Sequence, residues 1–229
     1  MPKKNIVVVG TSRGIGKALV QLFANNPDNH VLALGRNTEE MNQAFGELNN
    51  VTCHFLDLNS TSVESDCDKI FGDINQIDVL VNNAGYLVNK PFPEITSEDL
   101  TKSYQVNVIG VIQTVQSAVK KMKSAHIVNI SSVGGFQGSV KFSGLSAYST
   151  SKAALCSFTE LFAEEYKESN IKMNCLCLGA VQTEMLEEAF PGYEAPLKPN
   201  EMAEFIHDFA TNSHRFMNGK ILPVSLSTP

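Results

Sequence analysis

The chain has 229 residues, of which 43% are hydrophobic and 18% are charged. This size and composition predict one globular domain over residues 1–229, with room for a substantial core. The formal net charge of −6 argues against a general nucleic-acid or anionic-membrane surface, and no apolar run reaches the about 20 residues that span a bilayer. We therefore expect no nucleic-acid partner and no membrane association.

The first predicted element is an apolar, β-branched strand at residues 5–10, followed by a glycine-rich loop and a helix. The loop reads Gly-Thr-Ser-Arg-Gly-Ile-Gly from residue 10 to residue 16, and a helical pattern of apolar residues follows it. Glycines let the backbone turn tightly and let a pyrophosphate approach the helix N-terminus, where free N–H groups favour anions. The candidate cofactor-binding residues of this loop are Gly10, Ser12, Arg13, Gly14, Ile15 and Gly16.

The second strand, at about residues 30–34, is followed by Arg36. Dinucleotide folds that bind NAD usually place Asp or Glu at this point, on the ribose 2′-hydroxyl. This chain has no acidic residue between residues 31 and 38, and the Arg36 guanidinium instead suits a 2′-phosphate. Arg13 in the glycine loop is placed to reach the same phosphate. Two solvated arginines are the alternative interpretation, but their positions favour NADP.

The rest of the chain alternates helices with strands. Helices are predicted near residues 38–49, 60–72, 97–123, 147–168 and 200–213, and strands at residues 51–56, 78–81, 125–130, 171–178 and 219–224. This alternation predicts an α/β fold with a doubly wound parallel sheet of about seven strands and helices on both faces. Ligands should then bind beyond the C-terminal ends of the strands.

A phenol and an ammonium are predicted to share one face of the 147–168 helix. Tyr148 and Lys152 are four residues apart, and positions four apart in a helix project to the same side. A lysine beside a phenol stabilises the phenolate and lowers the phenol pKa, which makes Tyr148 a candidate proton donor. A solvated helix face is the alternative. Asn107, in the middle of the 97–123 helix, has apolar neighbours and is expected to be partly enclosed.

The cysteines and histidines predict no metal site. Cys53, Cys67, Cys156, Cys175 and Cys177 suit reduced thiols better than a disulfide framework, so we expect a cytoplasmic protein. The chain has no Cys-x-x-Cys motif, and its histidines are scattered singly rather than at the spacing of metal ligands.

Taken together, these motifs resemble the short-chain dehydrogenase/reductase family in its compact single-domain form. The resemblance covers nearly the whole chain, from Gly10 to about Val224. The glycine loop resembles the family's cofactor loop, and the Asn-Asn-Ala-Gly segment at residues 82–85 matches a second family motif. The four residues that match the family's catalytic tetrad, in order, are Asn107, Ser132, Tyr148 and Lys152.

The resemblance implies a Rossmann-type fold, NADP(H) as cofactor and a role for each matched residue. Tyr148 would donate a proton to a carbonyl oxygen, Ser132 would hydrogen-bond that oxygen, and Lys152 would lower the tyrosine pKa and bind the nicotinamide ribose. Asn107 would hold a water that relays protons towards Lys152. Asp57 would contact the adenine, and Thr183 the nicotinamide carboxamide. The remaining implied cofactor residues are Leu58, Asn83, Ala84, Gly85, Gly179 and Val181.

Three departures from the family pattern accompany this resemblance. Leu178 stands where the family commonly has proline before Gly179, and the loop between Ser132 and Tyr148 is somewhat longer than usual. The C-terminus lacks the usual glycine-rich tail. The family implies a homodimer or homotetramer, and the missing tail argues against the tetramer.

Apolar residues of two segments are expected to form the substrate walls. The first segment is a flap at residues 185–199, and the second is the loop before Tyr148; the residues are Met185, Leu186, Phe190, Tyr193, Phe136, Phe142 and Leu145. They predict a small, fairly apolar ketone or aldehyde as substrate, although core or oligomer contacts are an equal alternative.

The sequence therefore predicts an NADPH-dependent oxidoreductase of the carbonyl reductase or alcohol dehydrogenase type. The alternatives are an NADP(H)-sensing regulator or scaffold without turnover, and the same enzyme running as an alcohol dehydrogenase.

Overall fold

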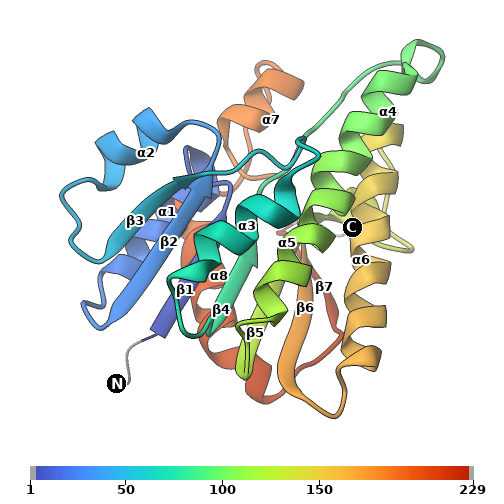
Figure 1. Cartoon of the computed structure of the whole chain (residues 1–229). Helices are drawn as coiled ribbons and strands as arrows, with labels where there is room; N and C mark the ends of the chain where they lie inside the picture. The colour runs from blue at the N-terminus through green and yellow to red at the C-terminus, as the bar shows by residue number, and fades with distance from the viewer. Residues whose placement is uncertain (1–3, 227–229) are drawn as a thin grey trace.

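The structure is a computed structural model and describes residues 4–226. One sheet of seven parallel strands, in the order β3-β2-β1-β4-β5-β6-β7, runs through this part of the chain (Figure 1). The strands are β1 (Lys4–Val9), β2 (Asn29–Gly35), β3 (Val51–Phe55), β4 (Val79–Asn82), β5 (Ser124–Ser132), β6 (Asn170–Leu178) and β7 (Ile221–Val224). The predicted doubly wound parallel sheet is confirmed.

Helices cover both faces of this sheet. The α-helices are α1 (Gly14–Ala24), α2 (Thr38–Phe45), α3 (Val63–Gly72), α4 (Ser97–Tyr104), α5 (Gly110–Val119), α6 (Ser146–Glu165), α7 (Glu184–Ala189) and α8 (Pro199–Asn212). In Figure 1, α3 and α5 lie in front of the sheet, with α1 and α8 behind it. Short 3₁₀ turns occur at Phe92–Glu94, Val133–Gly135 and Ser213–Arg215.

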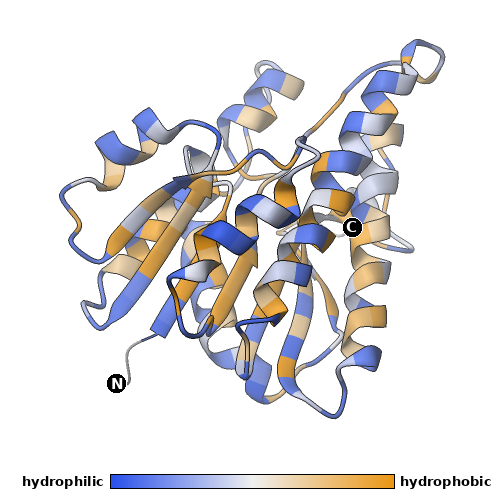
Figure 2. Ribbon diagram, in the orientation of Figure 1, coloured by the Kyte–Doolittle hydropathy of each residue, from blue (hydrophilic) through white to orange (hydrophobic). Residues whose placement is uncertain are grey.

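Successive residues of a central strand pack into two different cores. Ile6 and Val8 of β1 belong to the cluster under α1 and α8, whereas Val7 and Val9 belong to the cluster under α3, α5 and α6. All four side chains are at most 1% exposed. Side chains of a strand alternate between faces, so a strand covered on both sides is apolar over most of its length. Figure 2 shows hydrophobic colour along most of β2 and β4.

The strand order places a crevice between β1 and β4. The chain moves outward from β1 to β2 and β3, then returns to pair β4 with the other side of β1. In open parallel sheets, ligands bind at such a switch point, beyond the carboxyl ends of the strands. Gly10 follows β1 and Asn83 follows β4, so both lie at this crevice.

The predicted helix at residues 97–123 is not one regular helix. A π-helical turn at Gln105–Ile109 separates α4 from α5, and α5 ends at Val119. Asn107 lies within this turn and is fully buried, so it is more enclosed than the sequence predicted. π turns inside α-helices frequently mark functional sites.

Several predicted element boundaries also differ from the structure: the helix predicted near residues 60–72 begins at Val63, and the helix predicted at residues 147–168 ends at Glu165. Two further differences lie beside glycines. The helix predicted to reach residue 49 ends at Phe45, with Gly46 as its C-cap. The last strand begins at Ile221 rather than residue 219, because Gly219 adopts a positive φ of +67°, a conformation outside the β region.

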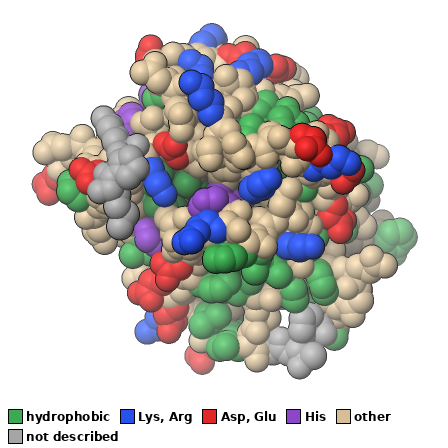
Figure 3. Space-filling model, turned by 90° about the horizontal axis from the view of Figure 1, so that it is seen from below, with side chains coloured by type: hydrophobic (Ala, Val, Ile, Leu, Met, Phe, Trp, Pro, Cys, Tyr) green, Lys and Arg blue, Asp and Glu red, His purple; other side chains and the backbone are tan. Residues whose placement is uncertain are grey.

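The flap predicted at residues 185–199 is partly helical. Its first part forms α7, and Leu197 forms an isolated parallel bridge with Val181. In Figure 1, α7 lies above the carboxyl ends of the strands. A membrane-spanning helix would need to be longer and more apolar than any helix within residues 4–226. The face drawn in Figure 3 intersperses basic and acidic side chains and carries hydrophobic side chains towards its lower part.

Candidate active site

A cavity of about 460 Å³ opens beyond the carboxyl ends of the strands. It is lined by segments that follow β1 through β6, as well as by α7 and the start of α6. Almost all the predicted cofactor and catalytic residues lie in its wall. The two exceptions are Gly16 and Asn107, which are both buried behind the wall.

The glycine loop packs closely on the segment after β4 and leads into α1 at the wall of the cavity. Gly10 has a φ of +87°, and a Cβ atom placed there would lie 2.6 Å from the Cα atom of Ala84. The Asn83 amide fixes the other side of the loop by donating to the Gly10 carbonyl at 2.8 Å. Arg13 is the N-cap of α1, and its side chain does not bond the first N–H groups of the helix. These N–H groups and the glycine cradle fit a pyrophosphate.

Both predicted phosphate-binding arginines line the cavity, but Arg13 already has a partner. Its guanidinium donates two hydrogen bonds to the Glu188 carboxylate on α7, at 2.5 and 3.2 Å. This bond raises the pKa of Arg13 and lowers the pKa of the Glu188 carboxyl. Arg36 follows β2 and has an exposed side chain at the cavity wall. Glu188 was missed by the sequence analysis, which considered only the apolar residues of the flap.

The first turns of α6 bring the phenol and the ammonium together as predicted. The Lys152 Nζ atom lies 5.8 Å from the centre of the Tyr148 ring and donates to the Ile130 carbonyl at 2.8 Å. Lys152 is only 3% exposed, and burial lowers its pKa to about 8. The charged form of a lysine is disfavoured where water is excluded.

The pKa of Tyr148 differs from the prediction. Burial raises the pKa of Tyr148 to about 12, and a hydrogen bond with Ser132 acts in the opposite direction. The net shift is therefore upward, because exclusion of water outweighs the hydrogen bond with Ser132. A lowering of the Tyr148 pKa by the Lys152 ammonium, which here donates to Ile130, stays a prediction. The phenol stays protonated at neutral pH, which is the form that donates a proton.

The end of β5 is tied to α6. Ser132 closes β5, and its hydroxyl oxygen accepts from the Gly134 N–H at 3.2 Å. Its neighbour Ser131 donates to the Lys152 carbonyl at 2.9 Å. The strand end and the helix therefore hold Ser132, Tyr148 and Lys152 in one fixed arrangement.

The Asn107 side chain forms hydrogen bonds with the backbone beside the cavity. Its Oδ1 atom accepts from the Tyr86 N–H at 2.8 Å, and its Nδ2 atom donates to the Tyr86 carbonyl and the Ser151 hydroxyl, each at 2.9 Å. These bonds fix the chain directly after the Asn-Asn-Ala-Gly segment. A Cβ atom on Gly85 would lie 3.3 Å from Lys152 Nζ and 3.5 Å from Asn107 Oδ1, so Asn107 also lies close to the lysine. The predicted water relay stays a prediction.

Apolar side chains form the outer end of the cavity. Of the predicted wall residues, Phe136 does not line it and packs instead against buried cysteines. The other six do line it: Phe142, Leu145, Met185, Leu186, Phe190 and Tyr193. Sequence reasoning missed Tyr86 and Leu87, although their position directly after the Asn-Asn-Ala-Gly segment was an available indication. Thr183 is the N-cap of α7, and its hydroxyl oxygen accepts from Leu186 N–H at 3.3 Å.

Comparisons with known proteins agree with this geometry. The family model described as short chain dehydrogenase matches residues 4–194. The 3-oxoacyl-[acyl-carrier-protein] reductase FabG of Aquifex aeolicus is 31% identical over 238 residues, covering 96% of this chain and 94% of that protein. Carbonyl reductase family member 4 of Xenopus laevis is 32% identical over 189 residues, covering 81% of this chain and 78% of that protein. A putative short chain dehydrogenase of Escherichia coli CFT073, solved in complex with NADPH, has a TM-score of 0.86 and 25% identity, with 97% of each chain covered.

A parallel sheet with a glycine-rich loop at the first helix and a half-buried tyrosine beside a buried lysine is typical of a dinucleotide-dependent oxidoreductase. The chain belongs to the short-chain dehydrogenase/reductase family, whose members use NAD(P)(H), and it acts on CH–OH or C=O groups.

Proposed function

We propose that this protein is an NADPH-dependent carbonyl reductase that acts on small, fairly apolar ketones or aldehydes. The observation that carries the proposal is the convergence of Ser132, Tyr148 and Lys152 on the cavity into which the glycine cradle opens. Bound NADPH would supply the hydride, and the protein's own residues would bind, orient and protonate the substrate.

The substrate carbonyl oxygen would accept hydrogen bonds from Ser132 and Tyr148. Tyr148 would give its proton to that oxygen as negative charge develops there, since its raised pKa keeps it protonated at neutral pH. The Lys152 ammonium, held by the Ile130 carbonyl, would stabilise the phenolate that remains. Positioned acid catalysis of this kind contributes about 10²–10⁴-fold in rate.

The preference for NADPH rests on Arg36. Its guanidinium lies at the cavity wall directly after β2, at the position where NAD-binding folds carry an acidic residue. Arg13 would contribute a second positive charge after leaving Glu188. The NADPH complex of the Escherichia coli relative supports this preference.

The substrate class rests on the outer wall of the cavity. Apolar side chains from α7 and from the loop before α6 favour an apolar carbonyl compound over a charged one. The carbonyl reductase named among the relatives supports a carbonyl compound as the substrate. Assembly into a homodimer or homotetramer stays a prediction, which size-exclusion chromatography with light scattering would test.

The test follows the absorbance of NADPH with a panel of small ketones and aldehydes. Tyr148→Phe removes the proton donor and should lower kcat by about 10²–10⁴-fold while NADPH binding is retained. Tyr166→Phe is the matched control, because Tyr166 caps the far end of α6 and stacks on Phe162 at 4.2 Å between ring centres. No NADPH consumption with any carbonyl, or equal activity of the two variants, would refute the proposal. NADPH binding without turnover would favour the alternative of a redox-sensing regulator.

A further inference from the structure

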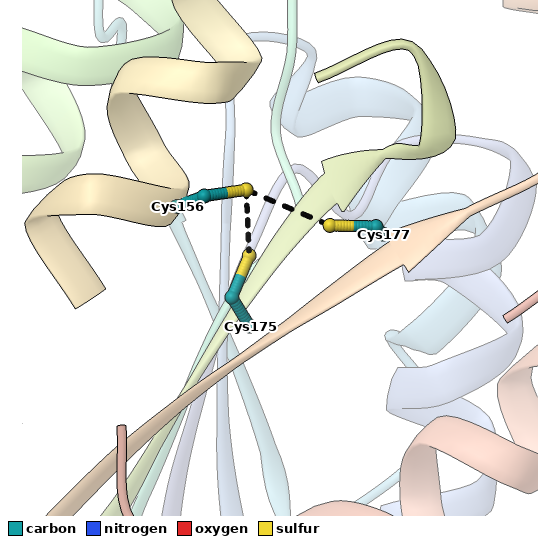
Figure 4. A group of neighbouring side chains, drawn as sticks. All are labelled: Cys156, Cys175 and Cys177. Carbon is teal, nitrogen blue, oxygen red and sulfur yellow. Dashed lines mark hydrogen bonds between the residues drawn. The ribbon is translucent and has the colours of Figure 1, made fainter. Parts of the chain in front are cut away.

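Three thiols meet in the core between α6 and β6 (Figure 4). The Sγ atom of Cys156, on α6, lies 3.9 Å from that of Cys175 and 3.5 Å from that of Cys177, both on β6. All three sulfur atoms lie within 4.8 Å of one another. Cys175 and Cys177 are fully buried, and Cys156 is 8% exposed. Spacing along the sequence did not predict this cluster, because the fold alone brings Cys156 to the strand.

The separations of these sulfurs, 3.9 and 3.5 Å for two pairs and at most 4.8 Å for the third, are close to those of a metal–thiolate site. A metal–thiolate bond of about 2.3 Å places the sulfurs of a trigonal or tetrahedral site about 3.8–4.0 Å apart. Among residues 4–226, no His, Asp or Glu side chain joins the three sulfurs at ligand distance. The nearest other polar contact is the Ser131 hydroxyl, 3.5 Å from the Cys156 Sγ atom. Thiolate ligands select soft ions, and a set of three without a fourth ligand suits Cu(I) better than tetrahedral Zn²⁺.

The surroundings of the cluster also suit a buried thiolate site. Half-buried Phe136 and Ile221 cover the sulfurs and keep water away. Burial lowers the pKa of Lys152, and negative charge on any of the three cysteines acts in the opposite direction, so the ammonium lies near enough to stabilise thiolates there. Three thiolates and one Cu(I) carry a net charge of −2, and the neighbouring ammonium offsets part of it. A buried charge is tolerated only where such a partner is present.

We propose that Cys156, Cys175 and Cys177 bind one Cu(I) ion as a three-thiolate site directly behind the catalytic lysine. Three Cu–S bonds form, and each thiol releases its proton to solvent, so no electron is transferred. Cys156 lies one helical turn beyond Lys152, which itself lies one turn beyond Tyr148. Loading the site removes the Cys156 S–H donor from Ser131, whose hydroxyl binds the Lys152 carbonyl. The ion would therefore contact the hydrogen-bond network that holds the catalytic helix.

The test titrates the reduced full-length protein with Cu(I) under anaerobic conditions, in competition with a chromophoric Cu(I) chelator. We expect one equivalent of Cu(I) to be withdrawn, and X-ray absorption to report three sulfur neighbours. Cys175→Ala and Cys177→Ala should each lose this equivalent. Cys53→Ala is the matched control, because Cys53 is a half-buried thiol on β3 outside the cluster, and it should keep the equivalent.

Four results would overturn the proposal: no Cu(I) withdrawn from the chelator, two sulfur neighbours instead of three, equal loss in Cys53→Ala, or preferential binding of Zn²⁺ when both ions are offered. Circular dichroism identifies a cluster variant that does not fold. In that case the sulfur count on the wild-type protein decides by itself. Neither the Cu(I) titration nor the X-ray absorption measurement depends on turnover. A failure of the Cu(I) proposal is therefore distinguishable from a failure of the proposed reductase activity.

Discussion

Acidification should destabilise this protein through one buried histidine. His126 on β5 is 1% exposed, and its Nδ1 atom lies 2.9 Å from the Ala210 carbonyl, to which it must donate. Its Nε2 atom lies 2.9 Å from the Nδ2 atom of Asn174. That amide also donates to the Met217 carbonyl, and the Asn174 Oδ1 atom accepts from the Lys220 N–H. The amide orientation is thus fixed, and Nε2 can only accept, which holds the ring neutral.

The magnitude follows from the pKa of this ring. Burial lowers the pKa of His126 from 6.5 to about 4. Between these values the unfolded chain binds the proton and the folded protein does not, so stability falls as the pH falls. With one pKa unit equal to about 1.36 kcal/mol, the loss is about 2 kcal/mol between pH 7 and pH 5 and about 3 kcal/mol by pH 4.

Urea unfolding at a series of pH values measures this loss. His126→Gln removes the titrating group, so its free energy of unfolding should depend on pH less steeply than that of the wild type below about pH 6.5. Above that pH the two profiles should run parallel, whatever their absolute separation. If the free energies of unfolding of the two proteins run parallel throughout the acid range, the reasoning is refuted, because the pH dependence of stability would then come from other titrating groups.

Three further substitutions test the cavity. Glu188→Gln frees Arg13 and should tighten NADPH binding in fluorescence titrations by less than about tenfold, since the ion pair is exposed. NADH binding should be unchanged. An equal change for both cofactors would contradict the role of Arg13. Gly10→Ala should lower the melting temperature and weaken dinucleotide binding in calorimetry. A φ of +87° costs an alanine about 1–2 kcal/mol, and the added Cβ atom would meet Ala84. If the variant binds the dinucleotide as tightly as the wild type, the loop relaxes freely. Asn107→Ala leaves the Tyr86 backbone N–H and carbonyl without their hydrogen-bond partners. It should lower the free energy of unfolding in urea by about 1–3 kcal/mol and should also lower kcat. An unchanged kcat would limit Asn107 to a role in stability.

Features that depend on neighbouring residues were predictable from the sequence. The apolar, β-branched run of β1 and the glycines that follow it indicate a buried strand and a tight loop at α1. Tyr148 and Lys152 are brought together by helical spacing alone. These predictions succeed because the period of a strand or helix sets which side chains share a face. The parallel sheet then follows from the alternation of elements.

Features that join distant segments required the tertiary structure. Arg13 and Glu188 are 175 positions apart, and no local pattern predicts that a flap carboxylate meets the phosphate loop. The three cysteines converge because α6 packs on β6, and the raised pKa of Tyr148 depends on what encloses the phenol. The sequence by itself determined which elements form and which side chains each one presents. Only the packing of those elements decided which groups exclude water from one another, and exclusion of water sets the charges on which the chemistry depends.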